Sequence, residues 1–184
     1  MTDIKRPKDP PPRDRRVSEA EESMLLQAMS YSDDMPVSSQ RQKVAIAFLI
    51  ALETAMRQGE IAKTKWSDVH IDERYIFPPH TITKTAVSRN VPLSARAIEL
   101  IGRLDQNKET MLGVSAGVVS TMFRAAVANC GIDNLTFHDA RHEATTRLAG
   151  KLQVVDLARV TGHRDIKQLM TYYNKDAREL AGLL

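Results

Sequence analysis

Nine consecutive apolar residues, Val44 to Leu52, constrain the fold more than any other part of this chain. They lie inside a longer segment, 40–56, that contains neither proline nor glycine, so we expect a single helix there. A helix that is apolar on all sides must be covered on all sides. This run is too short to span a bilayer, which requires about 20 residues. It therefore predicts a central helix around which the other elements pack.

Most of the remaining chain alternates between helical periodicity and polar turns. The first helix, 18–30, opens with a capping box at Ser18, and we expect it to bury Met24, Leu25 and Met29. Further helices are predicted over 95–107, 114–130 and 153–161, with two more that begin at Thr136 and Asp165.

Residues 63–93 have a different character. Three short β-prone segments, 69–71, 75–77 and 90–93, are separated by polar turns. We therefore predict a mainly α fold with a small three-stranded antiparallel β-sheet, that is, an α+β fold.

Length and composition limit the possible classes of protein. A chain of 184 residues corresponds to about one domain, and its single cysteine, Cys130, allows no internal disulfide. We assign 1–17 to a basic, proline-rich linker or arm and 18–184 to the domain. A net charge of +3 and a pI of about 9.1 favour a polyanionic partner. No signal peptide or membrane span is predicted, so we expect a soluble, intracellular protein.

The segment 136–174 holds the side chains best suited to chemistry. A tyrosine hydroxyl, with a pKa of about 10, is a weak nucleophile unless cations surround the phosphate that it attacks. His138 and Arg141 share one face of a predicted helix, and His142 lies one turn from His138. The other candidates are Arg57, Lys84, His163, Tyr172 and Tyr173.

Arg57 directly follows the buried helix, where a cation without a partner would be costly. Glu60 lies three residues later, so spacing alone favours a simple salt bridge between the two.

Five short segments together resemble one family. Ala55 to Glu60 is similar to its first-arginine motif, and Trp66 to Val69 to the continuation into its sheet. Lys84 with 88–93 is similar to its hairpin lysine and Val-Pro-Leu strand. The other matches are His138 to His142, Thr161 to His163, and a tyrosine nine residues later, which selects Tyr172. The family that these segments resemble is that of the tyrosine recombinases, or phage integrases, and the resemblance to its catalytic domain covers about residues 15–175.

The resemblance implies roles for these residues. Tyr172 would attack a DNA phosphodiester to give a 3′-phosphotyrosine, while Arg57, Arg141 and His163 donate hydrogen bonds to the phosphate oxygens. Lys84 would protonate the departing 5′-oxygen. The implied helpers are His138 for proton transfer at the tyrosine, Glu60 for positioning Arg57 or the neighbouring histidine, and His142 for packing. All six reacting side chains should converge on one basic cleft, and no metal, other cofactor or ATP is implied.

The resemblance also implies partners. The substrate would be double-stranded DNA, and the full-length protein would carry an N-terminal core-binding domain that this chain lacks. It would form a homotetramer on DNA, with accessory DNA-bending proteins, whereas the chain alone would be a monomer. The resemblance implies a location in the cytoplasm of a bacterium or phage-infected cell. It also implies that the protein recombines the DNA of a mobile genetic element. The tail 175–184 would dock on a neighbouring subunit or pack in cis.

Two other interpretations remain open, and a third is discounted. A type IB topoisomerase uses the same chemistry to relax supercoils, and a silent DNA-binding domain could share the fold. A zinc hydrolase could use His138, His142 and Glu143, although the second histidine of a helical zinc motif is missing. Departures from the family pattern are Thr161 for leucine, Asn174 for histidine, and a hairpin turn without glycine at 86–88.

Overall fold

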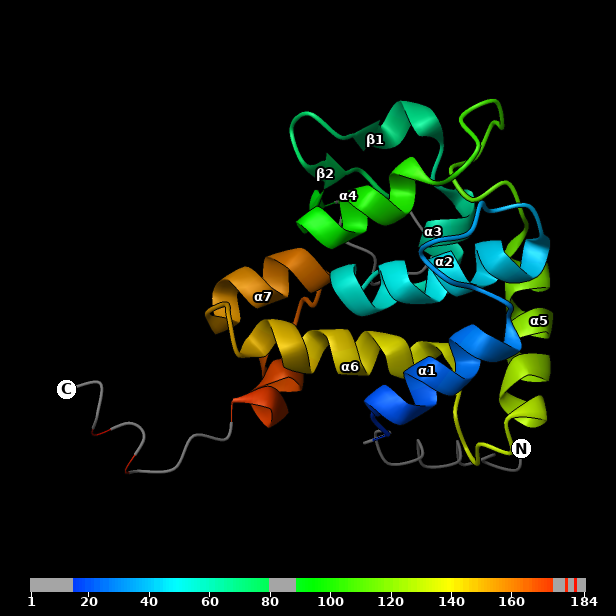
Figure 1. Cartoon of the computed structure of the whole chain (residues 1–184). Coiled ribbons are helices and arrows are strands. Elements are labelled where there is room, and N and C mark those ends of the chain that lie inside the picture. Colours follow the sequence, from blue (N-terminus) through cyan, green and yellow to red (C-terminus); the bar gives the residue numbers. More distant parts are fainter. Residues whose placement is uncertain (1–14, 80–88, 174–177, 179–180, 182–184) are drawn as a thin grey trace, which may run out of the picture.

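The computed structural model describes residues 15–79 and 89–173, together with Arg178 and Ala181. Lys84, Asn174 and most of the predicted arm and tail lie outside the described residues. Helix α2 (Gln40–Thr54) occupies the centre, and every residue from 44 to 52 is buried, as predicted. Helices α6 (Phe137–Ala149) and α4 (Ala95–Gly102) pack against it (Figure 1).

The main hydrophobic core joins three helices through aromatic rings. Phe48 of α2, Phe123 of α5 (Ala116–Asn129) and Phe137 of α6 lie with ring centroids 5.1 to 6.2 Å apart. Helix α1 (Glu19–Ala28) packs against α5. A smaller apolar cluster joins α7 (Val154–Thr161) to the 3₁₀ helix η2 (Ile166–Tyr172).

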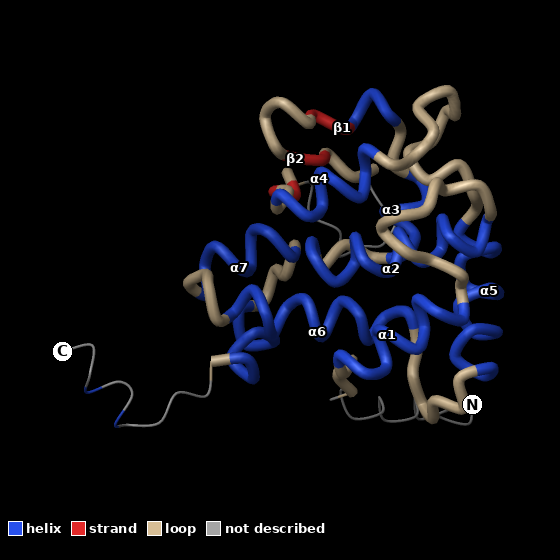
Figure 2. The backbone as a smooth tube through the Cα atoms, viewed as in Figure 1, coloured by secondary structure: helices blue, strands red, loops and turns tan. Residues whose placement is uncertain are grey.

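The sheet lies at one end of the molecule (Figure 2). Strands β1 (Val69–His70), β2 (Tyr75–Ile76) and β3 (Val91–Pro92) are antiparallel in the order β1-β2-β3, which confirms the predicted sheet. The 3₁₀ helix η1 (Trp66–Asp68) leads into β1, and the short helix α3 (Gln58–Lys63) precedes it.

Some sequence-based boundaries were wrong. Met24 is 42% exposed, because only the side of α1 that carries Leu25 faces the core. Helix α4 ends at Gly102 rather than 107, since the polar residues after it form a turn. Helix α5 begins after Ser115, whose hydroxyl accepts the N–H of Val118. None of the described helices is long and apolar enough to cross a membrane.

Candidate functional site

The junction of α2 and α3 sets the position of Arg57. Helix α2 ends at Ala55 in the left-handed conformation (φ 55°), and Arg57 is the extended residue that precedes α3. Glu60, in the first turn of α3, accepts the backbone N–H of Arg57 at 2.9 Å and its Nη1 at 3.1 Å. The salt bridge expected from spacing is therefore present, and the same carboxylate caps the helix.

Glu60 has a second cationic partner that lies far from it in the sequence. Arg89, which lies two residues before β3, donates from Nη1 to Oε1 of Glu60 at 3.0 Å and from Nη2 to Oε2 at 2.8 Å. The side chain of Arg89 is 7% exposed and that of Glu60 is 2% exposed. Burial alone would raise the pKa of Glu60, but Arg89 and Arg57 outweigh it and lower this pKa.

Arg89 also reaches the end of α7. Its Nε donates to the carbonyl of Val160 at 2.8 Å, and its side chain crosses directly over Gly162. A β-carbon on Gly162 would lie 3.0 Å from Cδ of Arg89, and this residue has a φ of +72°. Glycine is therefore required twice here, by the backbone conformation and by the close approach of Arg89.

Arg141 is a buried cation held by main-chain carbonyls. Its Nη1 donates to Ala55 at 2.5 Å and its Nη2 to Thr161 at 2.6 Å, so α6 is joined to the ends of α2 and α7. Burial, together with the charges of Arg57 and Arg89, lowers the pKa of Arg141 to about 9. The guanidinium remains a cation at neutral pH.

Arg57, Arg89 and Arg141 form what we call the arginine cluster. The carboxylate of Glu60 bridges Arg57 and Arg89, whereas main-chain carbonyls accept from Arg141. These three cations lie in a largely buried place, where unbalanced charge is unfavourable. An anion bound at this cluster would restore the balance.

His163 follows α7, and the charges of the arginine cluster affect its pKa. Its Nδ1 is 2.6 Å from the hydroxyl oxygen of Thr161. Burial lowers the pKa of His163 to about 4, with further contributions from Arg141, Arg57 and Arg89. The imidazole is therefore neutral at pH 7 when no anion is bound.

The tyrosine selected from the sequence contacts a histidine of α6. The hydroxyl of Tyr172 lies 2.9 Å from Nδ1 of His142, and the ring of His138 stands edge-on to His142 at 5.0 Å. Burial and the charge of His142 lower the pKa of His138. Tyr173 packs against the same apolar cluster of α7 and η2 as Tyr172, but its hydroxyl donates to the carbonyl of Leu152 at 2.7 Å.

The structure therefore gathers five of the six predicted reacting residues, while Lys84 lies outside the described residues. The five are linked through shared partners or mutual charge effects on their pKa values: Arg57, His138, Arg141, His163 and Tyr172.

Sequence reasoning missed two contacts, those of Arg89 and of the Thr161 hydroxyl. The sequence places Arg89 in a strand motif, and an arginine next to a buried β-strand is itself a signal for a buried ion pair. The sequence marks Thr161 only as a departure from leucine.

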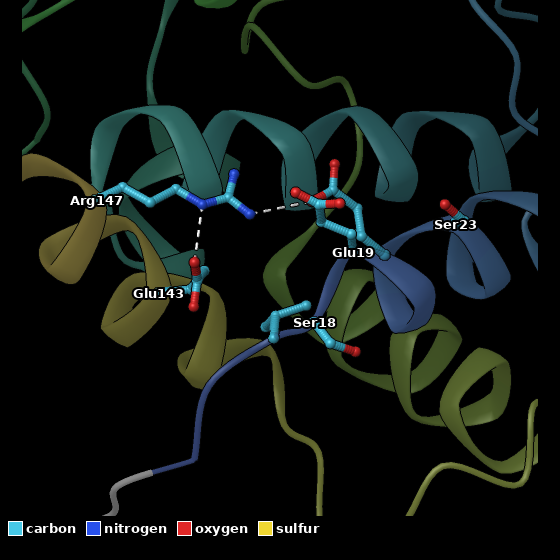
Figure 3. A pocket seen from close by; sticks show the side chains of 7 residues that line it. Ser18, Glu19, Ser23, Glu143 and Arg147 are labelled. Carbon is cyan, nitrogen blue, oxygen red and sulfur yellow. Dashed lines mark hydrogen bonds and ion pairs between the residues drawn. The ribbon is translucent and has the colours of Figure 1, made fainter.

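The carboxylate of Glu143 binds two arginines rather than His138 and His142, its partners in the zinc site considered above. It accepts from Arg16 at 2.8 and 3.0 Å and from Arg147 at 2.8 Å. No group of three potential metal-binding side chains is present in the described part of the chain. Glu143 and Arg147 instead line a pocket between α1 and α6, together with Ser18, Glu19 and Ser23 (Figure 3).

Comparison with known proteins identifies the class to which this fold and site belong. The sequence model of the phage integrase family matches residues 15–179, so the chain belongs to that family. A Haemophilus influenzae protein named as an integrase/recombinase is 36% identical over 100% of this chain and 60% of its own length. The shufflon-specific DNA recombinase of Escherichia coli is 34% identical over 98% of this chain and 45% of its own length.

Solved structures confirm the fold. The Tn1549 transposon integrase, solved with transposon right end DNA, gives a TM-score of 0.74 at 18% identity over 96% of this chain and 66% of that one. A lambda integrase tetramer bound to a Holliday junction gives a TM-score of 0.68 at 20% identity. The match covers 89% of this chain and 51% of the lambda integrase chain. The chain spans about half to three fifths of the curated relatives cited above.

Proposed function

We propose that the full-length protein is a site-specific DNA recombinase that cleaves and rejoins strands through a covalent bond to Tyr172. The observation that carries this proposal is the excess of cations in the arginine cluster, with the Tyr172 hydroxyl held on the neighbouring helix α6. A phosphodiester supplies the anion that the cluster lacks, and a tyrosine hydroxyl is a nucleophile suited to phosphorus.

In the proposed reaction, the Tyr172 oxygen bonds to phosphorus while the bond from phosphorus to the 5′-oxygen breaks. The tyrosine proton passes to a neighbouring histidine, and the 5′-oxygen takes a proton from Lys84. Arg57 and Arg141 stabilise the charge on the non-bridging oxygens, where the loss of one donor typically costs about 10²–10³ in rate. Attack by a second 5′-hydroxyl reverses these steps and rejoins the DNA.

We further propose that an N-terminal DNA-binding domain precedes this chain in the full-length protein, which acts as an oligomer on double-stranded DNA. The partial coverage of the relatives supports the first point. The lambda integrase tetramer on a Holliday junction supports the second by analogy.

A trapping experiment tests the proposal. The full-length protein is incubated in chelator with a library of random-sequence duplexes, each nicked near its centre, so that cleavage releases a short strand and cannot reverse. Adducts that resist denaturant are isolated and their DNA is sequenced. We expect an adduct from the wild type and from Tyr173→Phe, and none from Tyr172→Phe.

Three other outcomes would each change the proposal. An adduct lost in Tyr173→Phe alone moves the nucleophile by one residue. Binding to the duplexes without any adduct favours a silent DNA-binding domain. Relaxation of a supercoiled plasmid without strand exchange favours the topoisomerase class.

A further inference from the structure

Thr161, the last residue of α7, contacts two residues of the candidate site at once. Its carbonyl accepts from Nη2 of Arg141 at 2.6 Å, and its hydroxyl oxygen lies 2.6 Å from Nδ1 of His163. The hydroxyl oxygen also lies 2.6 Å from the carbonyl of Leu157. The residue is fully buried, so no solvent competes for these contacts.

The two hydroxyl contacts determine where the proton of His163 resides. A hydroxyl has one proton to donate, and the carbonyl of Leu157 can only accept. At 2.6 Å that contact is favourable only if the Thr161 hydroxyl donates its proton to Leu157. The same oxygen must then accept from His163, so Nδ1 carries the proton. In a neutral imidazole the other nitrogen, Nε2, is consequently a bare acceptor.

We propose that Thr161 is a positioning residue that holds the proton of His163 on Nδ1, so that Nε2 can donate to a phosphate only after it takes up a second proton. This inference rests on the proposed function. It makes His163 an imidazolium in the DNA-bound state and a neutral acceptor in the free protein.

The surroundings of His163 account for both states. The charged and titratable groups that act on it are Arg57 before α3, Arg89 before β3, and Arg141 and His142 on α6. These groups and burial keep the free imidazole neutral, with a pKa of about 4. A bound phosphodiester would introduce negative charge beside the same groups, which favours the second proton. Leucine, the family's residue at this place, could not accept from Nδ1, so the neutral ring could carry its proton on Nε2.

Two variants separate the hydroxyl from the shape of the side chain. Thr161→Val keeps the branched shape and removes the hydroxyl, whereas Thr161→Ser keeps the hydroxyl. The first readout needs no DNA: ¹⁵N NMR of this chain at pH 7.5, with the His163 signals assigned by their loss in His163→Asn. We expect the Nδ1–H tautomer in the wild type and in Thr161→Ser, and a shift toward Nε2–H in Thr161→Val.

The second readout is the rate of adduct formation against pH, with the full-length protein and a duplex recovered by trapping. Wild type loses its Nε2 donor as pH rises, whereas Thr161→Val keeps it. The ratio of the Thr161→Val rate to the wild-type rate should therefore rise with pH, by up to about tenfold per unit. The ratio for Thr161→Ser should stay flat.

The two readouts fail separately. An Nε2–H tautomer in the wild type, or one unchanged by Thr161→Val, overturns the role of Thr161. The expected tautomers with a flat rate ratio overturn its link to catalysis. A wild type that forms no adduct refutes the proposed function and the catalytic link with it, while the NMR result still decides how Thr161 acts on His163.

Discussion

The hydroxyl of Tyr172 lies 2.9 Å from Nδ1 of His142, one helical turn from His138, the histidine that the family resemblance assigns to proton transfer. The imidazole rings of His138 and His142 meet edge-on. His142 was expected only to pack behind the site. In this structure it is the histidine within hydrogen-bonding distance of the proposed nucleophile.

Substitution of His142 should therefore slow adduct formation. If Nδ1 takes the tyrosine proton, we expect His142→Ala to reduce the rate by about 10² or more. In His142→Asn the amide group can occupy the place of Nδ1, so it should position the tyrosine but accept no proton. Its rate should therefore lie between those of the wild type and His142→Ala. Single-turnover rates on the trapped duplex measure this, with His138→Ala as the comparison. A His142→Ala protein that reacts at the wild-type rate would refute the role.

The salt bridge between Glu60 and Arg89 should contribute more to the free energy of unfolding than the salt bridge between Glu60 and Arg57. Loss of one partner of a buried ion pair typically costs about 3–5 kcal/mol, so Arg89→Met should lower the free energy of unfolding by that order. Arg57→Met is a matched control, because it removes a cation from the same carboxylate. Arg57 is 36% exposed, so its loss should cost only about 0–1 kcal/mol. Urea unfolding of both variants provides the measurement, and equal losses would contradict the assignment.

Gly162 should tolerate alanine less well than another glycine of similar conformation. Gly131 has a φ of +63° and open space where a β-carbon would lie, so Gly131→Ala should cost only the left-handed strain of about 1–2 kcal/mol. Gly162→Ala should cost more, because its β-carbon would also displace Arg89. Thermal unfolding compares the two. Equal losses would indicate that Arg89 moves aside without penalty.

Acid should destabilise the DNA-free protein before its carboxylates titrate. The pKa of His163 is lowered from 6.5 to about 4 and that of His138 is also lowered, so the unfolded chain binds more protons in this range. The free energy of unfolding should then fall as the pH decreases from about 6.5 toward 4. His163→Asn, which can still donate to Thr161, should reduce this slope, and an unchanged slope would contradict the assignment. Chemical denaturation at several pH values measures the slopes.

The sequence was sufficient to predict the secondary-structure frame. The apolar run 44–52 required a buried helix, and Gly162 correctly marked the end of α7 in the left-handed conformation. The three strands also lie where β-prone residues alternate with polar turns. These features depend on periodicity and local backbone preference, which neighbouring residues determine. The exposure of Met24 could not be predicted in this way, because it depends on which side of α1 meets the core.

The sequence by itself determined the residue types of the candidate site and their order: an arginine after the buried helix, a His-x-x-Arg-His segment, a Gly-His pair and a tyrosine nine residues later. Only the tertiary structure decided their partners. It paired Arg89 with Glu60, 29 positions away in the chain, and placed the Tyr172 hydroxyl on His142. Such contacts join elements that are distant along the chain, and their geometry depends on how whole helices pack rather than on any local preference.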